Sequence, residues 1–565
     1  NLQLASVGNQ TNLRLNGDVT LTGPGTLTMS NNAQNQVFGH SGSTTEILTN
    51  ALGHTIQGAG QLGANQMGLD NQGLILATGS AGLVIDVSPA GMTNSGTLRA
   101  GTGVLTIQNS TVTSTPSGVL DAVGNDIIVT GSTINGTVQG SGGNKIFLEN
   151  SSNLLDVTNS TLLEIANAQT GLLTGTFTNS GNLQLASVGN QTNLRLNGDV
   201  TLTGPGTLTM SNNIQNRIVG HSGATTEVLT NASGHTIQGS GQVGANQMGL
   251  DNQGLIVANQ AAALTIDLSD GAGITRTNTG ILRAAGGQLT IQGSNLTNTG
   301  GVIDAAGSSV LITGSSTITG GTLQSSGGGK VFVQGSANLA NVRNTGQAEI
   351  VNAQASLLTG TFTNDGNLQL SSAGNQTDVR LNGNVTLAGA GTLTMSNNGQ
   401  NRILGNSGAT TEVLTNAASH TIQGSGKVGA GQTGLINQGL ILANQSTALT
   451  VDTSVAGGGL INNGTMRAQN GTLTINDALT GSGTLQVEPA SVMNLANVAN
   501  AQGRLVMGAA GSTLNIGNQN LTINNDYTNV AAGAGNAFNR RAGISGTGQI
   551  LAGGDVVQAI TGTTV

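Results

Sequence analysis

A long internal duplication is the feature of this sequence that most constrains its fold. Residues 1–32 reappear letter for letter at 182–213, and a looser copy begins at Asn367. The second and third copies start slightly farther apart than the first and second copies do. A chain that repeats at this scale is usually an array of stacked units, whose function depends on length and surface rather than on one chemical centre. We therefore divide it into three large repeats, the third of them partial, and a divergent C-terminal segment: 1–181, 182–366, 367–477 and 478–565.

A shorter repeat lies inside the long one. Gly73 and Gly96 follow asparagines in N-x-G units, and Gly118 follows Pro116-Ser117. Together with Gly53 upstream, these glycines recur at nearly even intervals. Their spacing defines a unit of about 20–23 residues, which is the size of one coil of a solenoid, so the chain would hold roughly 27 coils.

Apolar and polar residues alternate within each unit, as in Leu105-Thr106-Ile107-Gln108. Successive side chains of a strand point to opposite faces, so this alternation predicts short strands with one buried face. Gly, Asn and Asp gather between the alternating runs, and they tolerate the left-handed backbone angles of sharp corners. No window has a helical stripe with caps. Hairpins closed by Asn-Gly turns are the alternative, but small aliphatic side chains favour the thin core of an all-β, parallel β-helix (β-solenoid).

Composition narrows the functional classes. Hydrophobic residues make up 36% of the chain, charged residues only 7%, Trp and Cys are absent, and Tyr occurs once. With no basic stripe and no aromatic platforms, we expect no nucleic acid partner. With no polybasic patch and no continuous apolar run long enough to cross a bilayer, we expect no membrane insertion. The lack of cysteine fits either a reduced cytoplasm or a bacterial surface protein.

The chain is expected to be part of a longer protein. Later copies carry a lead-in at 176–181 and 361–366 that the first copy lacks, so a targeting signal would lie upstream. The stretch from Asn525 to about Gln549 contains the single tyrosine, Tyr527, together with Phe538 and the pair Arg540-Arg541. We interpret it as the last coils or as a junction.

Units of the form N-x-G-x-[LI]-x-A suggest a family. They occur at 71–77, 94–100, 252–258 and 437–443. The units resemble the repeats of filamentous-haemagglutinin-type proteins, large exported β-helical adhesins of Gram-negative bacteria, and 525–541 is also similar to sequence in such proteins. The resemblance implies a right-handed β-helix, export through an outer-membrane partner and a place on the bacterial cell surface. It transfers no functional residue.

The most prominent recurring polar group is Gly39-His40-Ser41-Gly42 followed by Glu46, which returns as His221 and Glu227. A histidine and a glutamate could form an acid/base or metal pair. The third copy has Asn406 in place of the histidine and keeps Glu412, so we expect a turn with outward polar groups. A second histidine, in HTIQG, is expected at a strand edge; it occurs at His54, His235 and His420.

Acidic residues recur as well, at Asp86, Asp267 and Asp452 and at Glu164 and Glu349. Carboxylates on neighbouring coils could reach the separations that glycoside hydrolysis needs. Polysaccharide-cleaving grooves also tend to have aromatic platforms, which this chain lacks, so we expect no enzyme and no catalytic residue.

Other sites are weighed in the same way. The Gly-Gly-x-Gly-x-Asp nonapeptide of calcium-binding β-helices is absent, and we expect neither metal nor cofactor. Thr-x-Thr pairs, at 20/22, 26/28, 201/203, 207/209 and 392/394, recur too rarely for an ice-binding face and fit outward strand positions. Asparagines near the turns are expected to stack as hydrogen-bonded ladders. N-x-S/T triplets leave glycosylation open.

These patterns predict a non-enzymatic extracellular segment of a large bacterial surface or matrix protein, acting as a fibre, sheath component or adhesin stalk. Expected partners are further copies or repeats of the same chain. The alternatives are an adhesin that binds a surface glycan or receptor directly and a polysaccharide-active β-helix enzyme.

Overall fold

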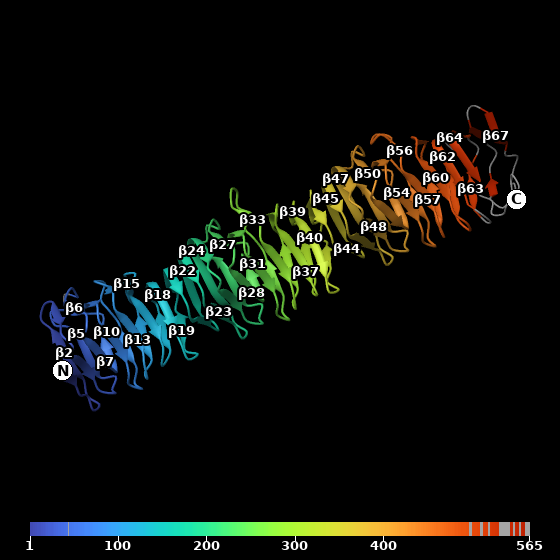
Figure 1. Ribbon diagram of the computed structural model, residues 1–565. Coiled ribbons are helices and arrows are strands. Elements are labelled where there is room, and N and C mark those ends of the chain that lie inside the picture. The colour runs from blue at the N-terminus through green and yellow to red at the C-terminus, as the bar shows by residue number, and fades with distance from the viewer. Residues whose placement is uncertain are drawn as a thin grey trace. The chain divides into compact units, whose positions relative to one another are not determined.

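The fold is a stack of parallel strands (Figure 1). A computed structural model describes residues 1–42, 44–496, 500–508, 512–517, 520–529, 543–545, 549–552 and 555–559, with the backbone alone from 526 onward. Over these residues the chain forms strands and no helix, stacked as a β-solenoid of about 23 turns. The predicted all-β parallel β-helix is confirmed, while its right-handedness stays a prediction.

The predicted number of coils, roughly 27 from the size of one repeat unit, is too high. Coil length varies more than the glycine spacing indicates: a long coil separates Thr26 from its register partner Thr55, whereas a much shorter one separates Val119 from Thr137. The longest coils carry the loop between β5 (Asn35–Gly39) and β6 (Ile47–Asn50). Loops at corners add residues to a coil without shifting the strand register. The same number of residues therefore forms fewer coils than the repeat unit predicts.

Two compact units make up the molecule, residues 1–289 and 290–565. The repeat boundaries proposed from the sequence stay a prediction. In the first unit, three rows of strands run through the coils, and each is named here from its first strands. Row A begins with β1 (Leu2–Leu4) and β4 (Thr26–Met29), row B with β2 (Thr11–Leu15) and β5, and row C with β3 (Val19–Leu21) and β6.

In the second unit the three rows begin at β36 (Asn295–Thr297), β37 (Val302–Ala306) and β38 (Val310–Thr313). Past residue 478 the parallel stack continues through β60 (Thr484–Val487), β62 (Asn500–Met507) and β64 (Leu521–Asn529). It ends in an antiparallel pair, β66 (Gln549–Ala552) with β67 (Asp555–Ala559). Phe538 and the pair Arg540-Arg541, singled out in the sequence, lie outside the described residues.

Aliphatic columns fill the interior. In row A, Leu27, Ile56, Ile75 and Leu98 stand on one another through successive register pairs, and each is fully buried. Burial of each such side chain contributes about 1.5–3 kcal/mol relative to leaving it exposed. The period-two alternation therefore identifies the core positions correctly.

The N-x-G unit marks one corner of the solenoid. In Asn94-Ser95-Gly96, asparagine is fully buried, and a Cβ added at Gly96 would lie 2.0 Å from the carbonyl oxygen of Gly73 in the preceding coil. A Cβ at Gly118 would meet the carbonyl oxygen of Asn94 at the same distance. Glycine is thus needed because the backbones of successive coils approach too closely for any side chain.

The two identical segments lie in different rows. Leu2–Leu4 (β1) opens row A, whereas the same letters in β23 (Asn182–Ala186) belong to row B, which is continuous from β2 through β21 (Leu162–Ala166). One large repeat therefore adds a third of a turn to a whole number of coils. Identical surfaces of the first two repeats face different directions around the first unit.

This duplication offers a matched test of the corner. Gly206 and Gly25 occupy the same place in the identical segments, but a Cβ at Gly206 would lie 2.5 Å from the Gly181 oxygen, whereas at Gly25 the nearest atom, Asn1 Oδ1, is 3.6 Å away. We expect Gly206→Ala to lower the free energy of unfolding by about 2–3 kcal/mol through overpacking and Gly25→Ala to change it little. Urea denaturation of both variants measures this, and equal effects would contradict the close approach of coils.

Candidate functional site

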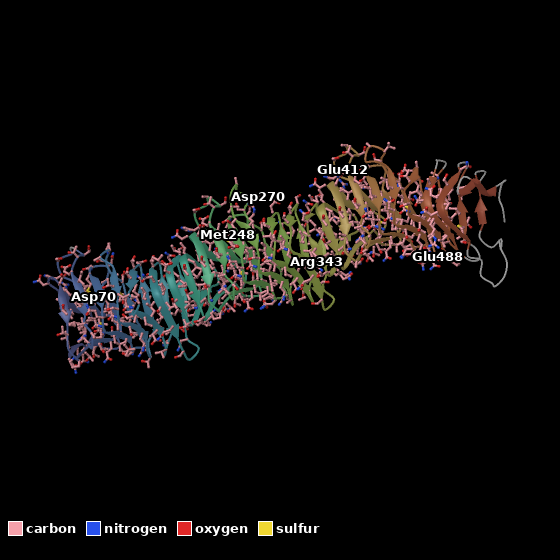
Figure 2. All side chains as sticks on the ribbon, turned by 45° about the horizontal axis from the view of Figure 1, so that its top comes forward. Asp70, Met248, Asp270, Arg343, Glu412 and Glu488 are labelled. Atoms are coloured by element: carbon pink, nitrogen blue, oxygen red, sulfur yellow. The ribbon has the colours of Figure 1, made fainter. Side chains whose placement is uncertain are left out.

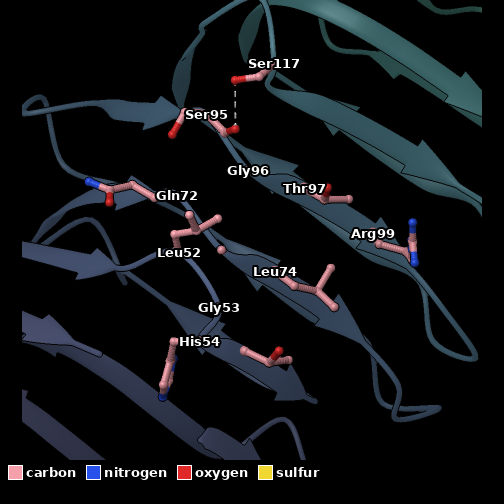
Figure 3. A pocket seen from close by; sticks show the side chains of 12 residues that line it. Leu52, Gly53, His54, Gln72, Leu74, Ser95, Gly96, Thr97, Arg99 and Ser117 are labelled. Carbon is pink, nitrogen blue, oxygen red and sulfur yellow. Dashed lines mark hydrogen bonds between the residues drawn. The ribbon is translucent and has the colours of Figure 1, made fainter. Parts of the chain in front are cut away.

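A hollow on the first unit lies along the glycine corner (Figure 3). It has a volume of about 440 Å³, and Gly53, Gly73 and Gly96 are among the residues that line it. A related hollow of about 390 Å³ lies in the second repeat beside His235. The ionisable residues of the first hollow are His54 and Arg99. Arg99 is paired with Asp121 at 2.8 Å, so the hollow has no nucleophile beside a free base.

Buried asparagines form the predicted ladders behind this corner. Asn50 Nδ2 donates to Asn71 Oδ1, and Asn71 Nδ2 donates to Asn94 Oδ1, both at 2.8 Å. In the second unit Asn416, Asn437 and Asn462 repeat the pattern at 2.7 Å. All these residues are fully buried. In each of these asparagine pairs the Nδ2 of the earlier residue donates to the Oδ1 of the later one, so the ladder has one direction.

The HTIQG histidines belong to the ladders, which the sequence did not reveal. Each precedes a strand edge as expected, but His235 and His420 are 1% and 0% exposed, and His54 is also buried. His420 Nδ1 lies 2.8 Å from Asn416 Oδ1, and its Nε2 lies 3.2 Å from Asn364 Nδ2. Because Asn364 and Asn416 offer a donor and an acceptor, the imidazole is neutral with its proton on Nδ1.

The imidazole of His420 bridges two ladder asparagines, Asn364 and Asn416, that are separated by a coil without an asparagine at this corner. Asn364 ends β45 (Ala355–Asn364), and the next coil, at the end of β47 (Thr377–Ala388), places Leu387 and then Gly389 at this corner. Leu387 in turn lies opposite Asn416 of β50 (Val413–Asn416). His235 makes the same connection between Asn179 and Asn231 in the first unit. Each of these two histidines thus joins two stretches of the asparagine ladder.

Burial shifts the acid–base behaviour of these histidines. Desolvation lowers the pKa of His235 and of His420 to about 4. It also lowers the pKa of His54, with a further contribution from the N-terminal charge. A charged imidazole would lose its hydration and turn a second N–H toward a donor amide. These histidines are therefore poor general bases and are held neutral by the structure.

The glutamates of the GHSG loops point inward, which corrects the prediction of outward polar groups for the whole motif. Glu46, Glu227 and Glu412 are 5%, 4% and 4% exposed, although His40 and His221 are exposed. Figure 2 labels Glu412, whose Oε1 accepts the backbone N–H of Ser407 at 2.7 Å.

The carboxylates close these loops. Burial raises the pKa of Glu412, but hydrogen bonds from Ser407 and from nearby backbone N–H groups outweigh it, and the net pKa is lowered; Glu227 behaves alike with Ser222. A Cβ at Gly405 would lie 2.8 Å from Glu412 Oε2, which explains the glycine before the loop. Histidine and glutamate thus have separate environments and form no acid/base pair.

Asp86, the first of the recurring aspartates, faces no second carboxylate on the adjacent coils of its row. Asp86 follows β11 (Leu83–Ile85), and by register it lies between Gly63 and Gln108 of the adjacent coils. Burial raises the pKa of Asp86, against a smaller effect of its hydrogen bond from Gln61. Burial also raises the pKa of Asp267, helped by Asp270. Asp452 follows β55 (Leu449–Val451) in the second unit and is partly buried.

The recurring glutamates bind lysines of the preceding coil. Glu164 pairs with Lys145 at 2.6 Å, and Glu349 pairs with Lys330 at 2.7 Å. These are cross-strand ion pairs of the ordinary surface type. Their recurrence is explained by coil stacking.

Polar side chains on the outer face hydrogen-bond between coils. Asp70, labelled in Figure 2, accepts from Thr93 Oγ1 of the next coil at 2.5 Å. The Thr-x-Thr pair Thr207 and Thr209 donates to one acceptor, Asn182 Oδ1, at 2.8 Å each. The threonines lie outward as expected, and these hydroxyls hold neighbouring coils together.

One charged cluster was missed from the sequence. In the third repeat Asp378 receives Arg380 and Arg402, at 3.1 Å and 2.7 Å. The second repeat keeps both arginines, as Arg195 and Arg217, but replaces the aspartate by Asn193. Aligning the three copies position by position would have revealed this change.

Among the described residues, no group of three or more His, Cys, Asp or Glu side chains is placed to hold a metal ion. Over the same residues, no helix is both long and apolar enough to cross a lipid bilayer. Comparison with known proteins identifies no relative: no family model, no curated protein and no solved structure matches this chain.

Proposed function

We propose that this chain is a structural segment of a large bacterial cell-surface or matrix protein, exported through an outer-membrane partner and working as a fibre, sheath component or adhesin stalk. The observation that carries the proposal is the buried, one-directional asparagine–histidine ladder, which links coil to coil in both units. Such a ladder uses the polar interior for stacking rather than for chemistry. The resemblance of the N-x-G units to filamentous-haemagglutinin-type repeats supports the location.

The arrangement of the repeats fits this role. Strand pairing passes from coil to coil, so each coil stabilises its neighbours. Since identical surfaces of the first two repeats lie in different rows, one chain can offer the same weak contact in more than one direction. Several weak contacts acting together give a large total avidity, which suits a matrix or fibre.

Electron microscopy of the native material tests the proposal. A structural role predicts elongated particles or filaments whose axial repeat is set by this protein alone. Compact isolated particles would contradict it. Turnover of a polysaccharide that is lost when Asp86, Asp267 and Asp452 are replaced together would instead establish the enzyme alternative.

A further inference from the structure

The arginine cluster differs between repeats in a way that points to a ligand. In the third repeat, Arg402 binds Asp378 with two hydrogen bonds, Nε to Oδ1 at 2.8 Å and Nη2 to Oδ2 at 2.7 Å. Arg380 donates Nη2 to the same Oδ2 at 3.1 Å. The Asp378 side chain is only 4% exposed. Two guanidinium groups therefore converge on a single buried carboxylate.

The second repeat has the same backbone frame without that carboxylate. Asn193 lies opposite Arg217 and Arg195 opposite Val219, just as Asp378 lies opposite Arg402 and Arg380 opposite Leu404. The amide of Asn193 donates to Thr170 Oγ1 at 3.4 Å. Asparagine carries no charge, so the frame holds two positive charges and no negative one.

Both guanidinium groups lack partners. Arg195 Nε and Arg217 Nε are buried from solvent and have no hydrogen-bond acceptor. Within the described part of the chain neither arginine forms an ion pair or a hydrogen bond. A buried donor on a charged group costs free energy unless an acceptor satisfies it. The chain has a net charge of −8, yet these two neighbouring arginines have no carboxylate partner.

A hollow lies beside the corresponding cluster of the third repeat. It has a volume of about 410 Å³, and its wall includes Asp378, Arg380 and three side-chain amides, Gln354, Asn375 and Gln376. The second repeat keeps all three amides, as Gln169, Asn190 and Gln191. Amides both donate to and accept from hydroxyl groups, and arginine binds carboxylates with two parallel hydrogen bonds.

We propose that Arg195 and Arg217 form a binding site for the carboxylate of an acidic sugar, with the amides of Gln169, Asn190 and Gln191 facing its hydroxyls. By register Asn193 fills the position that Asp378 holds in the third repeat, so the sugar carboxylate would bind the outward N–H groups of the half-buried Arg195 and Arg217 rather than take that position. In the third repeat Asp378 already pairs with both arginines. The described part of the chain therefore has one such pair of arginines that can bind an external carboxylate. The site does not depend on whether the protein assembles into fibres.

Titration calorimetry of the full chain at low salt with trigalacturonate as the probe tests the proposal. We expect millimolar or tighter binding with one site per chain and none of the fully methyl-esterified trisaccharide, which keeps the ring and loses the charge. Asn193→Asp supplies an internal carboxylate and should weaken binding at least tenfold, as should Arg217→Gln.

Loss of binding could also result from misfolding, so a variant that gains a site serves as the control. Asp378→Asn frees the arginines of the third repeat and should raise the stoichiometry from one site to two. Unchanged binding in Asn193→Asp, or equal binding of the methyl ester, would overturn the site. Binding of a short oligoglutamate or of sulfate, with none of trigalacturonate, would overturn the assignment to a sugar.

Discussion

Lowering the pH from 7.5 to 4 should destabilise the protein by about 3 kcal/mol for each of His235 and His420, because burial lowers their pKa from 6.5 to about 4 and each pKa unit corresponds to about 1.4 kcal/mol. Between pH 6.5 and pH 4 each of these histidines is protonated in the unfolded chain and neutral in the folded chain. Stability from this source is complete above pH 6.5 and is lost as the pH falls toward 4.

The structure explains why the loss is large. Protonated His420 would carry an N–H on Nε2, directed at the amide donor of Asn364, and its charge would lie at a fully buried position. Turning the Asn364 amide does not help, since its Oδ1 already accepts from Asn344 at 2.9 Å. The ladder must therefore break at the histidine.

Urea denaturation between pH 7.5 and 4, compared with a His235→Gln/His420→Gln variant, measures this effect. The lowered pKa values of Glu227 and Glu412 add to acid destabilisation, and the raised values of Asp86 and Asp267 oppose it. The difference in pH slope between the two proteins isolates the histidines. Parallel slopes from pH 6.5 to 4 would show that the imidazoles are not held neutral.

Replacing one ladder asparagine should be nearly as damaging. Asn437 accepts from Asn416 and donates to Asn462, both at 2.7 Å, and it also donates to the carbonyl oxygens of Gly439 and Thr465. Asn437→Ala would leave two buried amide groups unsatisfied, each costing about 1–3 kcal/mol, so we expect a loss of about 3–5 kcal/mol in the free energy of unfolding.

The adjacent Gln438 provides the control. Gln438 belongs to the same N-x-G unit but is exposed, so Gln438→Ala should change stability by less than about 0.5 kcal/mol. Hydrogen exchange would locate the effect, with protection lost first in the coils around β53 (Gly434–Asn437). A similar stability for the two variants would mean that the ladder contributes little to stacking.

Much of the fold could be predicted because its signals are local. Alternation in Leu105-Thr106-Ile107-Gln108 identifies the buried residues, since side chains alternate faces in any strand. The N-x-G unit predicts a corner, although the reason for its glycine, contact with a carbonyl oxygen of the preceding coil, involves a residue far away in the sequence. The sequence overestimates the number of coils because a loop such as 221–227 lengthens a coil without altering its strands.

The site residues could be predicted less well because they depend on which coils stack. His420 meets Asn364 of a distant coil, skipping the coil between them, and no local pattern indicates that pairing. Glu412 was expected outside because Asn406 replaces the histidine of its loop in this repeat, yet its carboxylate closes the loop from within. The open arginine pair follows from a single difference between repeats, Asn193 against Asp378.

X-ray diffraction from an aligned preparation of the protein tests the stacking of coils most directly. Strands that pair from coil to coil place a strong reflection at about 4.8 Å parallel to the long axis of the particles. The same reflection perpendicular to that axis, or the axial repeat of an α-helix in its place, would contradict the account.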